Sequence, residues 1–311
     1  MLNYSVVKSW PFADVSNTYS ADDCILYALS VGMAADPFDE ADLRYAIEGD
    51  LQVLPTFVAT VGAPGAWASH PETGIDWMQI LHGEHRMRFY RALPSQGTLL
   101  SQTRVIGIAD KGTDTGALVT TERDVRAARS GELLAQIEHV SFCRADGGYS
   151  IEGAPSDPML PPLPKAPQRP AQASMEMPTQ QNAALLYRLN GDRNPVHALP
   201  HAWRKAGFDR PILHGLCTYG MAARALIRLA CNGNAARLRY VAARFSAPVF
   251  PGETLVLKLW DGAAGVGDRT LHFEVHVKER GVTVLSHGLA ETQDQPLPMA
   301  ESESVVPTVG E

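Results

Sequence analysis

Hydrophobic and polar residues alternate along several stretches of the chain, and this alternation is typical of strands that bury one face. Glycine, aspartate or proline residues separate the stretches, which indicates turns between consecutive strands. Small and apolar residues at 218–230 instead predict a long helix. Helices that are segregated from runs of strands in this way predict an α+β fold. The predicted strands are 99–108, 117–125, 132–142, 254–260, 270–277 and 282–291.

Residues 153–170 interrupt this pattern, because they contain seven prolines and show no periodicity. Proline lacks a backbone N–H and fixes φ, so the stretch is incompatible with a helix or a central strand. It is predicted to be an extended, semi-rigid linker. We therefore divide the chain into an N-terminal half (1–152), a linker (153–175), a C-terminal half (176–295) and a tail (296–311).

The two halves resemble each other in sequence. Residues 88–99 (RFYRALPSQGTL) match 244–255 (RFSAPVFPGETL), and residues 26–29 (LYAL) match 186–189 (LYRL). Internal similarity of this kind indicates one duplicated unit. Each half is expected to contain a helix, an irregular region, a longer helix and then antiparallel strands. In the N-terminal half, the longer helix is expected to follow residues 54–57.

Composition and charge exclude several classes of partner and site. The chain has 311 residues, of which 45% are hydrophobic, and a net charge of -7, which argues against nucleic-acid or anionic-membrane partners. No apolar stretch approaches the length of about 18 residues that a membrane helix needs, and the first residues lack a signal-peptide pattern, so we expect a soluble, cytoplasmic protein. The four cysteines are scattered without a CxxC pair, which argues against a zinc site or a disulfide framework.

The strongest chemical signal is the segment 192–197, which reads DRNPVH. Asp192 and His197 lie close enough in sequence to aim at one point, and Pro195 stiffens the turn between them. A carboxylate and an imidazole together are suited to acid–base chemistry on one water molecule. Further along, Gly215 precedes the predicted long helix, where a bare backbone N–H can stabilise a developing oxyanion.

This segment resembles the hydratase 2 and MaoC-like dehydratase family. The family pattern is an aromatic residue, an aliphatic residue and then G-D-x-N-P-hydrophobic-H, and the resemblance extends over most of the chain, in the two-repeat form. It implies a double hot-dog fold, in which an antiparallel sheet wraps a long helix in each repeat. The residues that match the pattern are Tyr187, Leu189, Gly191, Asp192, Asn194, Pro195, Val196 and His197.

The resemblance also implies the activity, an (R)-specific enoyl-CoA hydratase or 3-hydroxyacyl-CoA dehydratase. Asp192 and His197 would hold one water for syn addition, Asn194 would orient it, and the Gly215 N–H would stabilise the thioester enolate. Neither a metal nor another cofactor is implied, since coenzyme A is part of the substrate. Implied substrate contacts are His82, Gly83, Lys111 and Phe245, together with Arg193, Pro195 and Val196 inside the motif.

The N-terminal half has lost the catalytic pair, because Gly32 and Pro37 stand opposite Asp192 and His197 in the repeat. The resemblance implies that this half accommodates the acyl tail. A polyanionic CoA ester also requires a local basic patch against the acidic background. The candidates for that patch are Lys111, Arg86, Arg88 and Arg244.

Several alternatives remain open. A hot-dog thioesterase would attack the thioester carbon and gives no reason for the full motif, whereas a non-catalytic acyl-CoA-binding subunit would not need Asp192 and His197. Metal binding by His197 with His201 is not expected, because Pro200 lies between them and no Glu or Cys ligand set accompanies the pair. A metal site at His82 and His85 is not expected either, because they precede a strand and the family resemblance explains the segment better. The acyl chain could be straight, branched, steroidal or a diacid, and a homodimer is compatible with the architecture.

Overall fold

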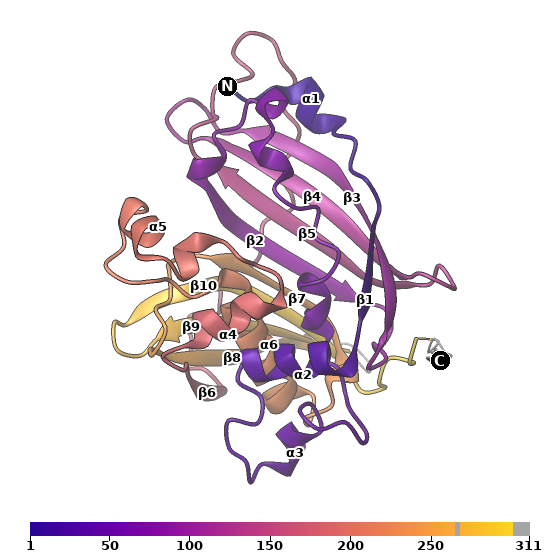
Figure 1. The fold of residues 1–311 in the computed structure, drawn as a ribbon. Helices are drawn as coiled ribbons and strands as arrows, with labels where there is room; N and C mark the ends of the chain where they lie inside the picture. Colours follow the sequence, from indigo (N-terminus) through magenta and orange to yellow (C-terminus); the bar gives the residue numbers. More distant parts are fainter. Residues whose placement is uncertain (265–267, 301–311) are drawn as a thin grey trace.

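A computed structural model describes residues 1–264 and 268–300, so the predicted tail beyond residue 300 lies outside the described residues. Its main feature is one ten-stranded sheet, ordered β1-β3-β4-β5-β2-β7-β10-β9-β8-β6, in which all neighbours pair antiparallel (Figure 1). The strands are β1 Val15–Tyr19, β2 Ile80–Phe89, β3 Gly97–Asp110, β4 Ala117–Ala127, β5 Leu133–Cys143, β6 Ala173–Pro178, β7 Leu238–Phe245, β8 Thr254–Ala264, β9 Asp268–Val277 and β10 Val282–Gln293.

The strand order is symmetric about its centre. The N-terminal half supplies β1-β3-β4-β5-β2, and the C-terminal half supplies the same arrangement in reverse, so that β2 and β7 pair at the junction. Arg86 lies directly opposite Ala242 in this pair, and the sequence match of residues 88–99 with 244–255 makes these two residues equivalent. A pseudo-two-fold axis therefore passes through the junction, which confirms the predicted two-repeat fold.

The long helix α6 (Gly215–Ala230) packs its apolar face against the C-terminal part of the sheet (Figure 1). Helix α2 (Ala21–Ser30) lies against it so closely that a Cβ on Gly220 would come within 2.7 Å of both Tyr27 and Val31. One hydrophobic core runs through both halves. The remaining α-helices are short: α1 Tyr4–Lys8, α3 Glu40–Leu43, α4 Ala183–Tyr187 and α5 Pro200–Lys205.

The N-terminal half lacks the expected longer helix. Its place is taken by the 3-10 helix η1 (Pro55–Ala59), which is buried but only five residues long. The helix ends because Gly62 and Gly65 adopt φ values of 62° and 70°, with Pro64 between them. The concave face of the N-terminal sheet is therefore covered by a shorter element than the equivalent face of the C-terminal sheet.

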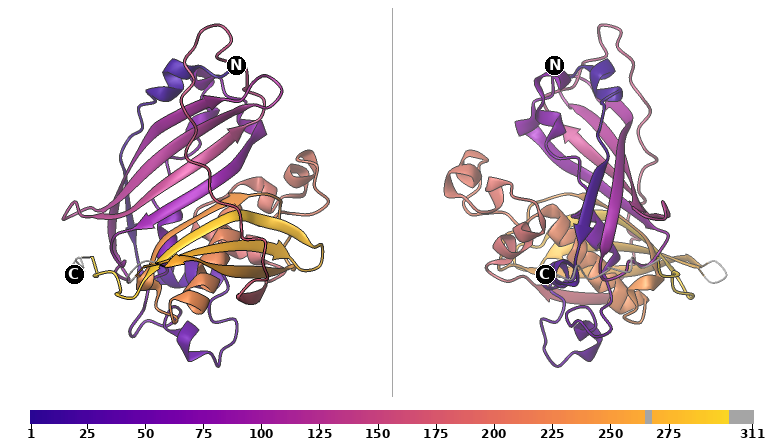
Figure 2. Two further views of the ribbon diagram at one scale, coloured as in Figure 1. Left: turned by 180° about the vertical axis from the view of Figure 1, so that it is seen from behind. Right: turned by 45° about the vertical axis from the view of Figure 1, so that its right-hand side comes forward.

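The proline-rich segment contains neither helix nor strand and crosses the face of the sheet opposite to the helices (Figure 2). It contacts that face where Arg86 donates a hydrogen bond to the Pro161 carbonyl at 2.9 Å. The predicted linker ended at residue 175, but β6 already begins at Ala173, because its backbone completes the edge of the sheet. Among the described residues, none of the helices combines the length and apolar character needed to cross a membrane.

Candidate functional site

The segment 191–197 forms a compact loop whose shape follows from its own residues. Gly191 adopts a left-handed φ of 111° and ends the preceding helical turn. The Asn194 N–H then donates to Asp192 Oδ1 at 3.0 Å, and the Val196 N–H donates to Asn194 Oδ1 at 3.2 Å. These two side-chain turns, followed by a proline at the first position of the 3-10 helix η6 (Pro195–His197), fix the loop.

The loop leaves Asp192 and Asn194 exposed and turns His197 inward, where the side chain is buried. His197 Nδ1 lies 2.9 Å from the Ile212 carbonyl oxygen. A carbonyl only accepts, so Nδ1 carries the proton and Nε2 keeps its lone pair. Burial lowers the pKa of His197 below its ordinary value, although the Ile212 carbonyl and the Asp192 charge act in the opposite direction. The imidazole is therefore neutral near pH 7 and can accept a proton.

His214, the residue before Gly215, completes the cluster with Asp192 and His197. It is the N-cap residue of α6, and its ring stacks on His197 with centroids 3.6 Å apart. Its Nε2 donates to the Asp192 backbone carbonyl at 3.2 Å, while Nδ1 is buried without a partner in the described structure. Burial, followed by the nearby His197, lowers the pKa of His214 to about 4. No role for His214 was predicted from the sequence.

Gly215 begins α6 directly after His214. The N–H of a first helical residue has no acceptor within its own helix, and the helix dipole places partial positive charge there. A Cβ at this position would lie 3.0 Å from Cε1 of Phe245, so glycine lets the helix start approach the β7 strand closely. The ring of Phe245 in turn lies 4.2 Å from the ring of His82 on β2. Gly215, Phe245 and His82 are therefore consecutive neighbours.

The other predicted substrate contacts are divided between the loop 191–197, strand β2 and the turn after β3. Pro195 and Arg193 are exposed in the loop and Val196 is half-buried, while Gly83 sits in β2 beside the Val140 carbonyl. Lys111 is exposed in the turn after β3, where its ammonium nitrogen lies 3.7 Å from Met159 Sδ. The structure does not bring Lys111 into direct contact with the loop.

The predicted basic patch is not formed by its arginine candidates, because carboxylates neutralise them. Glu84 accepts hydrogen bonds from both Arg86 and Arg244, each at 2.7 Å. Arg88 forms an ion pair with Glu291 at 2.9 Å. Glu84 lies on β2, which carries Arg86 and pairs with the β7 strand of Arg244, whereas Glu291 reaches Arg88 from β10 across the intervening β7. The linear sequence did not reveal these contacts.

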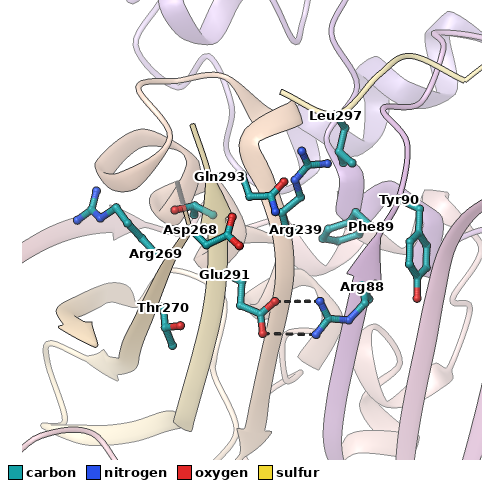
Figure 3. Close-up of a pocket in the computed structure, with 11 residues that line it drawn as sticks. Arg88, Phe89, Tyr90, Arg239, Asp268, Arg269, Thr270, Glu291, Gln293 and Leu297 are labelled. Atoms are coloured by element: carbon teal, nitrogen blue, oxygen red, sulfur yellow. Dashed lines mark hydrogen bonds and ion pairs between the residues drawn. The ribbon is translucent and has the colours of Figure 1, made fainter. Parts of the chain in front are cut away.

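Arg88 and Glu291 line a cleft of about 370 Å³ at the other end of β2 (Figure 3). His82 and Arg88 are six positions apart on β2, which corresponds to roughly 20 Å of strand, so this cleft is well separated from Asp192, His197 and Gly215. Apart from Arg88, a candidate for the basic patch, its lining includes none of the predicted catalytic or substrate-binding residues. The acid–base groups therefore lie elsewhere than in this cleft.

Within the part of the chain that the structure describes, two groups of side chains have a geometry suited to a metal ion. In each group one ligand atom per residue lies within 4.8 Å of the others. The first group is the cluster of Asp192, His197 and His214, and the second consists of His82, His85 and His139.

Comparison with known proteins assigns each half of the chain to a known protein family. Residues 17–145 match the family described as MFE-2 hydratase 2 N-terminal domain, and residues 162–283 match the MaoC like domain. The chain is 36% identical over 297 residues to the peroxisomal enoyl-CoA hydratase 2 of Arabidopsis thaliana, covering 91% of this chain and 94% of that protein.

Comparison with solved structures supports the same family assignment. The crystal structure of a MaoC-like dehydratase from Phytophthora capsici superposes with a TM-score of 0.79 at 31% identity, covering 94% of this chain and all of the other. A Mycobacterium tuberculosis protein described as having a double hotdog fold matches with a TM-score of 0.58 at 19% identity, over 90% of this chain and 93% of its own. The second likeness concerns the fold alone, and it confirms the predicted double hot-dog architecture.

Proposed function

Because this chain belongs to the MaoC-like dehydratase and enoyl-CoA hydratase 2 family, we propose that it adds water reversibly to trans-2-enoyl-CoA thioesters and forms (3R)-3-hydroxyacyl-CoA. The observation that carries the proposal is the juxtaposition of an exposed carboxylate and a buried, neutral imidazole beside the start of a long helix. These are Asp192, His197 and Gly215.

The proposed mechanism uses the two side chains on one water molecule. A ring nitrogen of His197 and a carboxylate oxygen of Asp192 lie within 4.8 Å of one another, which is a separation that a bridging water can span. One group removes a proton as the water oxygen attacks C3, and the other delivers a proton to C2 on the same face. Dehydration of the 3-hydroxyacyl thioester uses the same groups in reverse. Only protons and water move, so the reaction needs no redox cofactor, and the proposed acid–base pair gives no role to a metal.

Asn194 acts in this mechanism mainly by holding the loop. Its Oδ1 caps η6 and its N–H holds the Asp192 carboxylate, so both catalytic groups depend on it for their position. The thioester oxygen gains negative charge when C3 is attacked. The Gly215 N–H is suited to stabilise that charge, an effect typically worth a few kcal/mol.

Coenzyme A carries phosphates that need cations. Arg193, Arg204 and Lys205 are exposed in or near the catalytic loop, and they form no ion pair with the rest of the described chain. We assign phosphate binding to these side chains in place of the neutralised Arg86, Arg88 and Arg244.

The deciding experiment follows the enoyl-thioester absorbance of crotonyl-CoA and decenoyl-CoA after addition of the purified protein. We expect rapid loss of absorbance with the unmodified protein and a loss of activity of at least 100-fold in Asp192→Asn and His197→Ala. His201→Ala, an exposed histidine four residues beyond His197, is the matched control and should retain activity. Binding of CoA esters without turnover would favour a non-catalytic subunit, and release of free CoA would favour a thioesterase.

Two finer predictions concern the protein in the cell. We propose a cytoplasmic homodimer, although the Arabidopsis relative is named as peroxisomal. Light scattering of the purified protein tests the dimer, and fractionation of the producing cells tests the location.

A further inference from the structure

The concave face of the N-terminal sheet carries an unusual group of buried polar side chains. Arg123 on β4 is 7% exposed, and His85 on β2 is 2% exposed. Within residues 1–264 and 268–300, no carboxylate forms an ion pair with Arg123. A buried arginine without an anionic partner is costly, and such a group calls for an explanation.

Strand pairing brings the polar residues together. His85 on β2 lies directly opposite His139 on β5, which in turn lies opposite Thr121 on β4. Arg123 is two residues from Thr121, so its side chain emerges on the same face as this row. The acidic neighbours of Arg123 in sequence point to the other face, where Asp124 bonds Arg126 and Gln136. The face that holds Arg123 therefore lacks their negative charge.

A β-bulge adds His82 to the same group. Normal alternation would send His82 and His85, three residues apart, to opposite faces of β2. The pairing of β2 with β5 shifts by one residue between His82 and Glu84, and this bulge turns both imidazoles to one side. Gly83 makes the bulge feasible, because a Cβ there would lie 3.1 Å from the Val140 carbonyl oxygen. The ring centroids of His82 and His85 lie 5.1 Å apart, and those of His82 and His139 lie 4.0 Å apart.

Several nitrogen atoms of the group have no partner. Both ring nitrogens of His85 and Nε2 of His82 are buried without a hydrogen bond in the described structure. His82 and His139 are only partly buried, so solvent reaches the group. Arg123 donates to the carbonyls of Val58 and Ala59 in η1, at 3.2 and 3.3 Å, and so lies beneath the shortened helix.

The charge of the group decides what it can bind. Burial is the main reason that the pKa values of His85 and His139 are lowered, and the Arg123 charge lowers both further. The imidazoles are therefore neutral and lie in a positive field. This field opposes a divalent cation at the three histidines, although their spacing suits one. It attracts an anion that can accept hydrogen bonds from the guanidinium and from imidazole N–H groups.

We propose that Arg123, with His85 and His139, forms a subsite for a carboxylate carried by the acyl group of the substrate. The inference rests on the proposed hydratase function, and it selects thioesters of dicarboxylic acids over those with plain alkyl chains. The group lies within reach of the reaction centre, because Gly215, Phe245, His82 and His85 are consecutive neighbours. An acyl chain that extends from the Gly215 end past Phe245 enters this face of the N-terminal half.

The test compares pairs of trans-2-enoyl-CoA esters with six, eight and ten acyl carbons, one ending in a methyl group and the other in a carboxylate. For at least one length we expect kcat/KM of the carboxylated ester to exceed that of its partner by about tenfold or more. Arg123→Met should lower kcat/KM for this ester roughly 10- to 100-fold, as expected for a lost hydrogen-bonded charge pair, and change the methyl-ended ester less than about threefold. Arg123→Lys, which keeps the charge, should restore part of the preference.

Controls separate this role from a structural one. Arg126→Met removes another arginine of β4, one that is paired with Asp124, and should leave the ratio of the two substrates unchanged. If Arg123→Met lowers both substrates equally, or if the methyl-ended ester is preferred at every length, the inference is wrong while the proposed function stands. Binding of one equivalent of Zn²⁺ that His85→Asn abolishes would also overturn it.

A binding measurement covers the case in which no ester is hydrated, which would count against the proposed function instead. Saturated carboxylated and methyl-ended acyl-CoA esters are titrated calorimetrically into the protein. Tighter binding of the carboxylated ester that Arg123→Met abolishes would support the subsite independently of turnover. Equal affinities would refute it.

Discussion

The buried histidines make the free energy of unfolding depend on pH in a way that one substitution can test. Burial, assisted by the nearby Arg123 charge, lowers the pKa of His139 from 6.5 to about 4. The folded protein therefore binds fewer protons at this ring than the unfolded chain does between pH 6.5 and pH 4. Stability is present above pH 6.5 and is lost as the pH falls through this window. At about 1.4 kcal/mol per pH unit, His139 accounts for about 3 kcal/mol.

About 2 kcal/mol of this loss is expected between pH 7 and pH 5, because the folded ring is still mostly neutral at pH 5. His139→Gln removes the titrating ring, so the variant should lose about 2 kcal/mol less than the unmodified protein over this interval. His139 also lowers the pKa values of His82 and His85 electrostatically. Removing His139 relieves this effect, which further reduces the loss of unfolding free energy between pH 7 and pH 5.

Urea unfolding, followed by tryptophan fluorescence at constant ionic strength, measures the change at both pH values. His201→Gln, at an exposed position, is the control and should behave like the unmodified protein. The comparison uses the difference between two pH values within each variant, so a general loss of packing in His139→Gln cancels. Equal pH dependence of the unmodified protein and His139→Gln would falsify the assignment of a neutral, buried imidazole.

Two further predictions concern single contacts. Gly215→Ala places a methyl group 3.0 Å from the Phe245 ring, so we expect kcat/KM to fall about tenfold or more while the urea midpoint shifts little. Leu216→Ala, one residue further along the chain, is the control. Unchanged kinetics of Gly215→Ala would contradict the proposed role of the Gly215 N–H. Burial acts to raise the pKa of Glu84, but hydrogen bonds from Arg86 and Arg244 outweigh it and lower the pKa. Glu84→Gln should therefore destabilise the protein by about 3 kcal/mol at pH 7, and by progressively less as the pH falls through the pKa of Glu84 in the folded protein. A loss of unfolding free energy in urea that does not vary with pH would rule out the ionic contribution.

The loop 191–197 shows which structural features can be predicted from the sequence alone. Its geometry depends on hydrogen bonds between residues two positions apart, on Gly191 and on Pro195. The conformation of segment 191–197 is therefore determined by residues within the segment itself. The duplicated strand pattern also predicted antiparallel strands in each half, because alternation and turns are local signals. The double hot-dog arrangement of the two halves was implied by the family resemblance. The linker followed from proline content in the same way.

Tertiary structure decided the features that depend on register and packing. His214 stacks on His197 because the start of α6 and the loop meet in space, and no short-range pattern requires that contact. Arg86, Arg88 and Arg244 are neutralised because strand pairing places glutamates beside them.

The polar face of the N-terminal half has the same origin. Its residues come from three strands, and a bulge at Gly83 and the pairing of β2, β5 and β4 bring them together. The longer helix that the repeat predicted stops at η1, because two glycines and a proline follow it. Local sequence therefore determined the turn that carries the proposed catalytic groups, whereas strand register determined the polar surroundings proposed for the substrate, since register follows from pairing between distant segments.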